Sequence, residues 1–261
     1  MTNIILSGCS GRMGEAVSKM LATHTEARIV AGIDVNTDAS AKTFGFPVYQ
    51  NIADFPGKAD VIVDFSHHSA VCPLLDYAKA HKIPAVICTT GHTDEERQLI
   101  KDAANEIAVF TSGNMSIGIN LMLELCRRAA EVLGEGFDVE IIEKHHNKKL
   151  DAPSGTAVMI ADAISEKRSN TKYVYDRHNE RRERDSAEIG IHSVRGGTIV
   201  GEHEVIIGTE SQTITLKHEA HSRALFAEGA IAAAEFLYTR GAGLYDMNSL
   251  VKMEEKDTVS V

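Results

Sequence analysis

The residues best suited to chemistry lie in one run, Glu143 to Thr156, which reads Glu-Lys-His-His-Asn-Lys-Lys-Leu-Asp-Ala-Pro-Ser-Gly-Thr. Its two imidazoles and three ammonium groups could bind an anion and supply a proton. The backbone N–H groups of Gly155 and Thr156, with the Thr156 hydroxyl, could hold a carboxylate at the start of a helix. Lysines are often simply solvated, and we favour that role for Lys144 and Lys148. The run predicts an anion site with proton donors beside it.

A second motif, Gly8-Cys9-Ser10-Gly11-Arg12-Met13-Gly14, directly follows a short apolar strand and opens a helix. Glycines at this spacing let the backbone turn tightly and approach a pyrophosphate. The helix N-terminus then offers unpaired N–H groups and a partial positive charge. A tight strand-to-helix turn without a ligand would use glycines too, but the strand and helix around the motif favour dinucleotide binding.

The choice of cofactor is indicated by Asp34, about 20 residues past the last glycine of the turn. A carboxylate there can accept hydrogen bonds from ribose hydroxyls and repels the 2′-phosphate of NADP. The next residue, Val35, brings no guanidinium to offset that repulsion. We therefore expect NADH to be favoured, while Arg12, close enough to contact a phosphate, keeps NADPH possible.

The elements that must position these residues are short apolar runs alternating with helical patterns in the first half of the chain. Strands are expected at 4–6, 29–33, 61–63, 85–87 and 109–110, and helices at 12–21, 70–80 and 93–105. Thr93 and Glu96 have the spacing of a capping box. Strands without alternation, interleaved with helices, predict an α/β fold with an N-terminal Rossmann-like parallel sheet.

The pattern changes after Asn114. Helices are expected at 117–133, 154–164 and 223–238, and strands at 137–142, 189–194, 199–207 and 213–217, before a polar tail. Successive strands with short connections favour antiparallel pairing and a second, α+β domain. The turn Arg195-Gly196-Gly197 fits a hairpin between the strands at 189–194 and 199–207.

Composition narrows the class of partner. With 261 residues, a formal net charge of -10 and no tryptophan, the chain is expected to repel a nucleic-acid backbone and to lack stacking platforms. An anionic substrate then requires a local basic cluster. The four cysteines lack metal-ligand spacing, and we see neither a signal-peptide pattern nor a membrane-length apolar stretch. We expect no metal site, no membrane partner and a cytoplasmic location.

The basic run resembles the E-x-H-H-x-x-K-x-D-A-P-S-G-T-A signature of the dihydrodipicolinate reductases, also called 4-hydroxy-tetrahydrodipicolinate reductases. The glycine-rich turn resembles the N-terminal motif of the same family. Further matches cover most of the chain: Thr89-Thr90-Gly91, Asn114-Met115-Ser116-Ile117-Gly118 and Val194-Arg195-Gly196-Gly197. The resemblance implies an NAD(P)H-dependent oxidoreductase that reduces a small dicarboxylate, 4-hydroxy-tetrahydrodipicolinate or dihydrodipicolinate, to tetrahydrodipicolinate on the diaminopimelate route to lysine. It also implies a homotetramer.

The resemblance extends to individual residues. His145 is similar to the general acid/base position and Lys149 to the proton donor, and either can deliver the proton. The implied substrate contacts are His146, Gly155 and Thr156. The implied cofactor contacts are Gly8, Cys9, Ser10, Gly11, Arg12, Met13, Asp34, Cys88, Thr89, Thr90, Ser112, Gly113, Asn114 and Met115. The chain departs from the family where Cys88 replaces a usual glycine and Met115 a common phenylalanine.

We assign residues 1–116 to a dinucleotide-binding domain, with 222–261 packing back on it, and 117–221 to a smaller α+β domain for substrate binding and oligomerisation. Because the glycine-rich turn and the basic run fall in different domains, we expect domain closure to clamp the substrate.

Two other classes of protein share part of this pattern. Another two-domain Rossmann oxidoreductase, such as a sugar, aspartate or homoserine dehydrogenase, shares the first half but not the basic run. A protein that senses NAD(H) without turnover would not need the proton donors. His67 and His68 follow the strand at 61–63. The sequence is equally consistent with a position of these residues near the nicotinamide and with one away from it.

Overall fold

The computed structural model describes residues 1–37, 45–179 and 181–251, and the chain divides into two compact units. Unit 1 comprises Met1–Ile117 together with the segment from Arg223 onward, and unit 2 comprises Gly118–Ser222. Each unit has its own sheet and its own hydrophobic core.

Unit 1 is built on a seven-stranded sheet in the order β12-β6-β5-β4-β1-β2-β3, and every pairing in it is parallel. Its strands are β1 (Thr2–Ser7), β2 (Ala27–Ile33), β3 (Val48–Tyr49), β4 (Val61–Asp64), β5 (Ala85–Ile87), β6 (Ala108–Thr111) and β12 (Gly243–Tyr245). The predicted Rossmann-like sheet is confirmed. Continuous apolar runs suit it because both faces of a parallel sheet are buried.

Helices cover both faces of this sheet. They are α1 (Arg12–Leu21), α3 (Val71–His81), α4 (Asp94–Ala103) and α7 (Ala224–Leu237), with single-turn helices η1 (Ile52–Asp54) and η2 (His68–Ala70). Ile4 packs in one cluster with α1 and α7, whereas its neighbour Ile5 packs in another with α3 and α4. Successive strand residues point to opposite faces, so each face has its own core. The predicted capping box is confirmed, because Thr93 and Glu96 hydrogen-bond reciprocally at the start of α4.

Helix α7 and strand β12 complete unit 1 from the far end of the chain. A Cβ atom on Gly229 of α7 would lie 1.8 Å from the main-chain oxygen of Met115, so the helix runs against the backbone of the segment after β6. Strand β12 pairs with β6, and Met247 and Leu250 after it are buried. From the sequence, residues 222–261 are expected to pack back on this domain, but no strand is predicted after the helix at 223–238. Residues 252–261 lie outside the described part of the chain.

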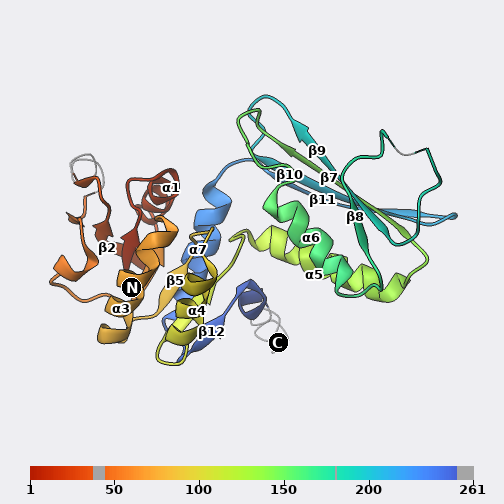
Figure 1. Ribbon diagram of the computed structural model, residues 1–261. Helices are drawn as coiled ribbons and strands as arrows, with labels where there is room; N and C mark the ends of the chain where they lie inside the picture. Colours follow the sequence, from red (N-terminus) through yellow and green to blue (C-terminus); the bar gives the residue numbers. More distant parts are fainter. Residues whose placement is uncertain (38–44, 180, 252–261) are drawn as a thin grey trace. The chain divides into compact units, whose positions relative to one another are not determined.

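Unit 2 is a five-stranded mixed sheet in the order β11-β10-β7-β9-β8, with two helices on one face (Figure 1). Its elements are α5 (Ile117–Leu133), β7 (Asp138–His145), α6 (Gly155–Ser165), β8 (Lys172–Val174), β9 (Glu188–Arg195), β10 (Gly201–Gly208) and β11 (Thr213–Ala220). Ile141, Ile189 and Val205 from three strands pack with α5 and α6 in one cluster. The predicted α+β class is confirmed.

One predicted pairing is wrong. β9 and β10 do not form a hairpin, because β7 lies between them, parallel to β9 and antiparallel to β10. The glycines after Arg195 instead end β9 beside β7, where the Gly196 N–H donates to the His145 carbonyl at 2.9 Å. The residues of a turn do not indicate whether another strand lies between the two strands that the turn connects. β7 also extends to His145, three residues beyond its apolar run.

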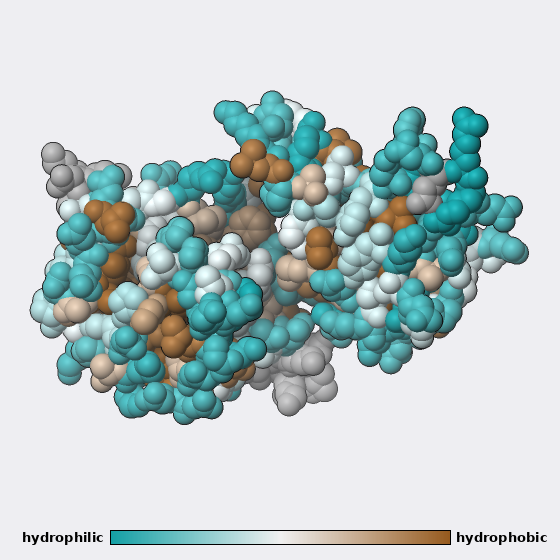
Figure 2. All heavy atoms as spheres, in the orientation of Figure 1, coloured by the Kyte–Doolittle hydropathy of each residue, from teal (hydrophilic) through white to brown (hydrophobic). Residues whose placement is uncertain are grey.

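No helix among the described residues is long and apolar enough to cross a membrane. On the face shown in Figure 2, hydrophobic residues form patches interrupted by hydrophilic ones.

We predict that Gly229→Ala destabilises unit 1, because the added methyl group would collide with the Met115 backbone, which cannot rotate away. Overpacking of this kind costs about 1 to 3 kcal/mol of the free energy of unfolding. Denaturant unfolding followed by circular dichroism measures it. Gly136→Ala is the control, since nothing lies within 4 Å of its Cβ position. If Gly229→Ala had the same free energy of unfolding as Gly136→Ala, then α7 would be able to shift away from Met115.

Candidate functional site

The predicted cofactor segments all follow strands of unit 1. Gly8 to Met13 come after β1, Asp34 after β2, Cys88 to Thr90 after β5, and Ser112 to Met115 after β6. Because these strands are parallel, their carboxyl ends meet at one edge of the sheet, where ligands of open α/β folds bind. The fold thus brings four segments, distant in sequence, to the same edge.

The turn between β1 and α1 has a backbone that only glycines allow. Gly8 has φ +75, and a Cβ on Gly14 would lie 2.3 Å from the Gly8 carbonyl oxygen. Gly11 is the N-cap of α1 and makes no side-chain capping bond. The turn therefore presents main-chain groups at a helix N-terminus, which suits the pyrophosphate of a dinucleotide.

Asp34 is tied to this turn. Its Oδ2 accepts a hydrogen bond from the Ser10 N–H at 2.9 Å, and its Oδ1 accepts one from the Asn36 N–H at 3.0 Å. Val35 beside it is 83% exposed. A carboxylate has about four acceptor positions, so Asp34 can hold the turn and still accept from a ribose hydroxyl.

The segments after β5 and β6 are ordered by local bonds. The Ser112 hydroxyl donates to the Asn114 carbonyl at 2.8 Å, and the Asn114 side chain accepts from the Ser116 N–H at 2.8 Å. Met115 is buried beneath this turn. Burial, reinforced by the nearby charge of Asp64, raises the pKa of the Cys88 thiol well above its usual value, which disfavours the thiolate form.

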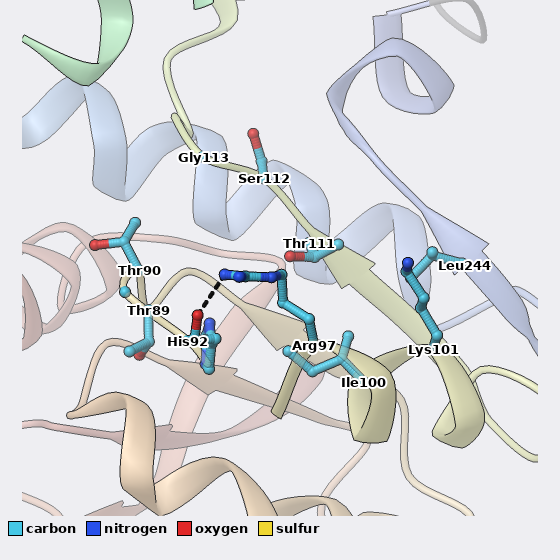
Figure 3. Close-up of a pocket in the computed structure, with 11 residues that line it drawn as sticks. Thr89, Thr90, His92, Arg97, Ile100, Lys101, Thr111, Ser112, Gly113 and Leu244 are labelled. Carbon is cyan, nitrogen blue, oxygen red and sulfur yellow. Dashed lines mark hydrogen bonds between the residues drawn. The ribbon is translucent and has the colours of Figure 1, made fainter. Parts of the chain in front are cut away.

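Two of these segments line one cavity of about 270 Å³, with α4 as another wall (Figure 3). Its lining is Thr89 to His92, Arg97, Ile100, Lys101, Thr111 to Gly113 and Leu244. Arg97 donates to the His92 carbonyl and pairs with Asp94 at 2.6 Å, while the imidazole of His68 pairs with Glu96 at 2.9 Å. His68 is thus held by α4.

In unit 2 the basic run is organised around Glu143, whose side chain is fully buried. Its Oε2 lies 2.6 Å from Nδ1 of His145, and its Oε1 accepts the Ser154 N–H at 3.1 Å. Arg195, from the parallel neighbour β9, donates to both oxygens at 2.7 and 2.8 Å. One carboxylate thus joins the predicted acid/base residue, the start of α6 and the end of β9.

The charge state of this group follows from its partners. Burial by itself would raise the pKa of Glu143, but hydrogen bonds from His145, Arg195 and Ser193 outweigh it and hold that pKa far below its usual range. The bond to Glu143 raises the pKa of Arg195 in turn. Glu143 and Arg195 are therefore ionised at physiological pH, and Nδ1 of His145 donates to the Glu143 carboxylate.

His203 of β10 lies next to this group. It is 4% exposed, its ring centroid is 5.3 Å from that of His145, and its Nε2 is 3.0 Å from the Ser154 hydroxyl. Burial, then the charges of His145 and other nearby bases including Lys149, lowers the pKa of His203 to about 3. His203 is neutral at physiological pH and cannot add a further cation.

The remaining residues of the run surround the start of α6. Ser154 caps the helix by accepting the Ala157 N–H at 3.2 Å, and Gly155 and Thr156 form its first turn after His146 and the following loop. Lys149 pairs with Asp151 at 2.8 Å. Of the other two lysines in the run, Lys144 forms an ion pair with Glu202 at 3.0 Å, and Lys148 is exposed.

Sequence reasoning missed Glu143, Arg195 and His203 as site residues. The available signal was the spacing of Glu143 and His145, two apart on a strand and therefore on the same face. Arg195 and His203 become neighbours of His145 only through the order β10-β7-β9.

We predict that His203 makes the protein sensitive to acid. A pKa of about 3 in the folded state, against an ordinary value of 6.5, means that unfolding takes up a proton as the pH falls below 6.5. Stability is then lost between these values, by about 2 kcal/mol from pH 7.5 to about pH 5. The His203→Gln variant should lose less of its free energy of unfolding than the wild type over this pH interval, as measured by urea unfolding. The exposed His178→Gln serves as control, and parallel curves for wild type and His203→Gln would contradict the prediction.

Comparison with known proteins adds independent information. A family model described as "Dihydrodipicolinate reductase, N-terminus" matches residues 2–115, and one described as "Dihydrodipicolinate reductase, C-terminus" matches residues 118–251. A 4-hydroxy-tetrahydrodipicolinate reductase from Caldanaerobacter subterraneus subsp. tengcongensis is 49% identical over 256 residues, covering 97% of this chain and 99% of that protein. The enzyme of the same name from Clostridium novyi is 44% identical, with the same coverage of both chains.

Solved structures agree with these relatives. A dipicolinate-bound dihydrodipicolinate reductase from Paenisporosarcina sp. TG-14 matches with a TM-score of 0.79 and 28% identity, covering 94% of this chain and 97% of that one. A myo-inositol dehydrogenase from Corynebacterium glutamicum, with a TM-score of 0.62 and 16% identity over 98% of this chain and 94% of that one, shares the fold. The chain belongs to the dihydrodipicolinate reductase family, whose members are nicotinamide-dependent oxidoreductases.

Proposed function

We propose that this protein reduces 4-hydroxy-tetrahydrodipicolinate to tetrahydrodipicolinate with NADH, in the diaminopimelate route to lysine. The observation that carries the proposal is the Glu143–His145–Arg195 array at the start of α6, in a chain that also has a dinucleotide turn after β1. The name of its relatives and the dipicolinate bound by one of them support a small dicarboxylate as substrate.

The turn after β1 suits the cofactor. Side chains at Gly8 and Gly14 would collide with the backbone of Phe65, Ser66 and the turn itself, so only glycines allow the tight turn that presents main-chain N–H groups at the start of α1. We assign the pyrophosphate to Gly8 through Met13, the ribose to Asp34, and the nicotinamide end to the segments after β5 and β6. When bound there, the reduced nicotinamide supplies a hydride. Asp34 disfavours a 2′-phosphate, which supports NADH over NADPH.

The substrate carries two carboxylates and so needs two anion sites. The first turn of α6, with the Gly155 N–H and the Thr156 hydroxyl, supports one of them, and His146 beside it supplies an imidazole. Lys149 offers an ammonium group for the second carboxylate or for the ring nitrogen. Two separate contacts orient a flat ring, which lowers the entropic cost of reaching the reactive geometry.

The 4-hydroxyl group of the substrate leaves as water, which gives a conjugated imine. Hydride addition to this imine leaves a negative charge on the ring nitrogen or an adjoining carbon, and a proton must neutralise it. His145 has Nδ1 bound to Glu143, so Nε2 is the atom that can exchange a proton. The carboxylate of Glu143 orients the imidazole ring and fixes its tautomer, as in other carboxylate–histidine pairs. Either His145 or Lys149 then serves as the acid, with the other orienting the substrate.

We also propose that unit 2 assembles a homotetramer through the sheet face that α5 and α6 leave open. Ile142, Val194 and Ile206 lie on that face, since their neighbours in the strands pack against the helices. Sedimentation equilibrium tests the assembly, and a monomer at micromolar concentration would reject it.

The activity can be tested directly. Pyruvate and aspartate semialdehyde are supplied with the preceding synthase, and loss of the reduced nicotinamide absorbance is followed on adding this protein. NADH oxidation that needs all components supports the proposal. Binding of NADH without oxidation would favour a sensor of the NAD(H) pool.

Replacing Lys149 with Ala is expected to lower turnover by more than about tenfold, because a positioned acid or orienting cation is lost. Binding of NADH, measured by fluorescence titration, should stay at the wild-type value. Lys148→Ala is the matched control, an exposed ammonium one residue away. Unchanged turnover of Lys149→Ala would remove this residue from the mechanism.

Replacing Asp34 with Ala is expected to shift the ratio of kcat/KM for NADPH over NADH upward by about tenfold, or about 1.4 kcal/mol, since a like charge is removed. Asp34→Asn separates charge from geometry, because its amide oxygen can still accept the Ser10 N–H. Both variants should shift the ratio, whereas the Ala variant alone should weaken binding of both cofactors. An unchanged ratio in both would refute this account of cofactor choice.

A further inference from the structure

A second fully buried carboxylate, Asp64, lies at the centre of the sheet in unit 1. Asp64 is the last residue of β4, the strand between β1 and β5, and it is 0% exposed. Among the described residues no lysine or arginine forms an ion pair with it. Burial of a carboxylate costs free energy unless hydrogen bonds replace its hydration, so its donors are informative.

The donors come from two different loops. Oδ1 accepts the Ser66 hydroxyl at 2.5 Å and the Ser66 N–H at 3.2 Å. Oδ2 accepts the Thr89 hydroxyl at 2.6 Å. The Asp64 carbonyl also accepts the Cys88 N–H at 3.0 Å. One residue therefore joins the loop after β4 to the loop after β5.

Both loops adjoin predicted cofactor contacts. A Cβ on Gly8 would lie 2.6 Å from the Phe65 carbonyl oxygen and 2.8 Å from the Ser66 nitrogen, so the loop after β4 packs directly on the glycine-rich turn. Thr89 and Thr90 line the cavity in front of α4 (Figure 3). The distance between the glycine-rich turn and the wall of this cavity thus depends on the hydrogen bonds of Asp64 to Ser66 and Thr89.

We propose that Asp64 is a positioning residue for hydride transfer, which fixes the loops after β4 and β5 relative to each other. This inference rests on the reductase function proposed above. A purely structural role would need only an apolar residue here, as Val61 to Val63 supply along the rest of β4. The carboxylate is found instead at the strand end that meets the cofactor loops.

The test is the single-turnover rate constant of NADH oxidation, measured by stopped flow with the protein in excess over NADH and the substrate saturating. Asp64→Asn reverses the bond to Thr89, and we expect the rate constant to fall between about 10-fold and 100-fold, as small misplacements do. A deuterium isotope effect at the transferred position confirms that hydride transfer is observed. The first-order rate constant is independent of how much protein is active, as long as the folded protein stays in saturating excess over NADH.

Asp60→Asn is the matched control. Asp60 precedes β4 at the opposite edge of the sheet, where it accepts hydrogen bonds from the backbone and side chain of Asn3 at 2.7 and 2.8 Å. Its rate constant should match the wild type. Ser66→Ala removes one arm of the Asp64 network without touching its charge, and we expect an intermediate fall; it also provides the test if Asp64→Asn does not fold.

The outcomes separate the two proposals. If the wild type fails to oxidise NADH with the substrate, the reductase function itself is wrong. If the wild type turns over and Asp64→Asn, or Ser66→Ala in its place, transfers hydride at the wild-type rate constant, only the role of Asp64 is overturned. A fall in Asp60→Asn equal to that in Asp64→Asn would also overturn it, because the effect would then not be specific to the cofactor edge.

Discussion

The Glu143 side chain in unit 2 has no contact with solvent, so the protein itself must satisfy its charge. Arg195 meets both oxygens in the bidentate geometry that guanidinium and carboxylate share, and His145 and the Ser154 N–H take the remaining positions. These donors belong to β9, β7 and the start of α6. The relative placement of the candidate proton donor and the candidate anion site therefore depends on this one carboxylate.

Its surroundings restrict what the two neighbouring imidazoles can do. His145 has one nitrogen bound to Glu143, and its Nε2 faces β10 where Gly201 has no side chain; a Cβ there would lie 3.1 Å from that nitrogen. His203 is buried deeply enough to stay neutral. The two imidazoles thus differ in their partners, because His145 meets a buried carboxylate and His203 meets a hydroxyl group.

Unit 1 gathers main-chain groups at the candidate dinucleotide site. A parallel sheet places the carboxyl ends of its strands at one edge. Glycines at positions 8 and 14 let the turn after β1 pack closely on itself and on the loop after β4. Asp34 and Asp64 then tie the neighbouring loops through side-chain oxygens. Carboxylates at strand ends serve as fixed points in both units, because each can accept several donors from separate segments.

Much of this architecture was readable from the sequence. The apolar runs with no alternation predicted a parallel sheet, and the Thr93–Glu96 spacing predicted a capping box that is present. The basic run contains Glu143 and His145, which pair in the structure. These features are local. A strand, a helix cap or a motif depends on residues close together in the chain, so the types and spacing of those residues predict it.

Tertiary structure decided which distant residues become partners. The glycines after Arg195 were consistent with a hairpin, yet β7 occupies the gap between β9 and β10. Only that insertion brings Arg195 and His203 to the two sides of Glu143 and His145. Strand order is set by burial of whole faces against α5 and α6, to which many weak contacts contribute, and no short stretch of sequence encodes it.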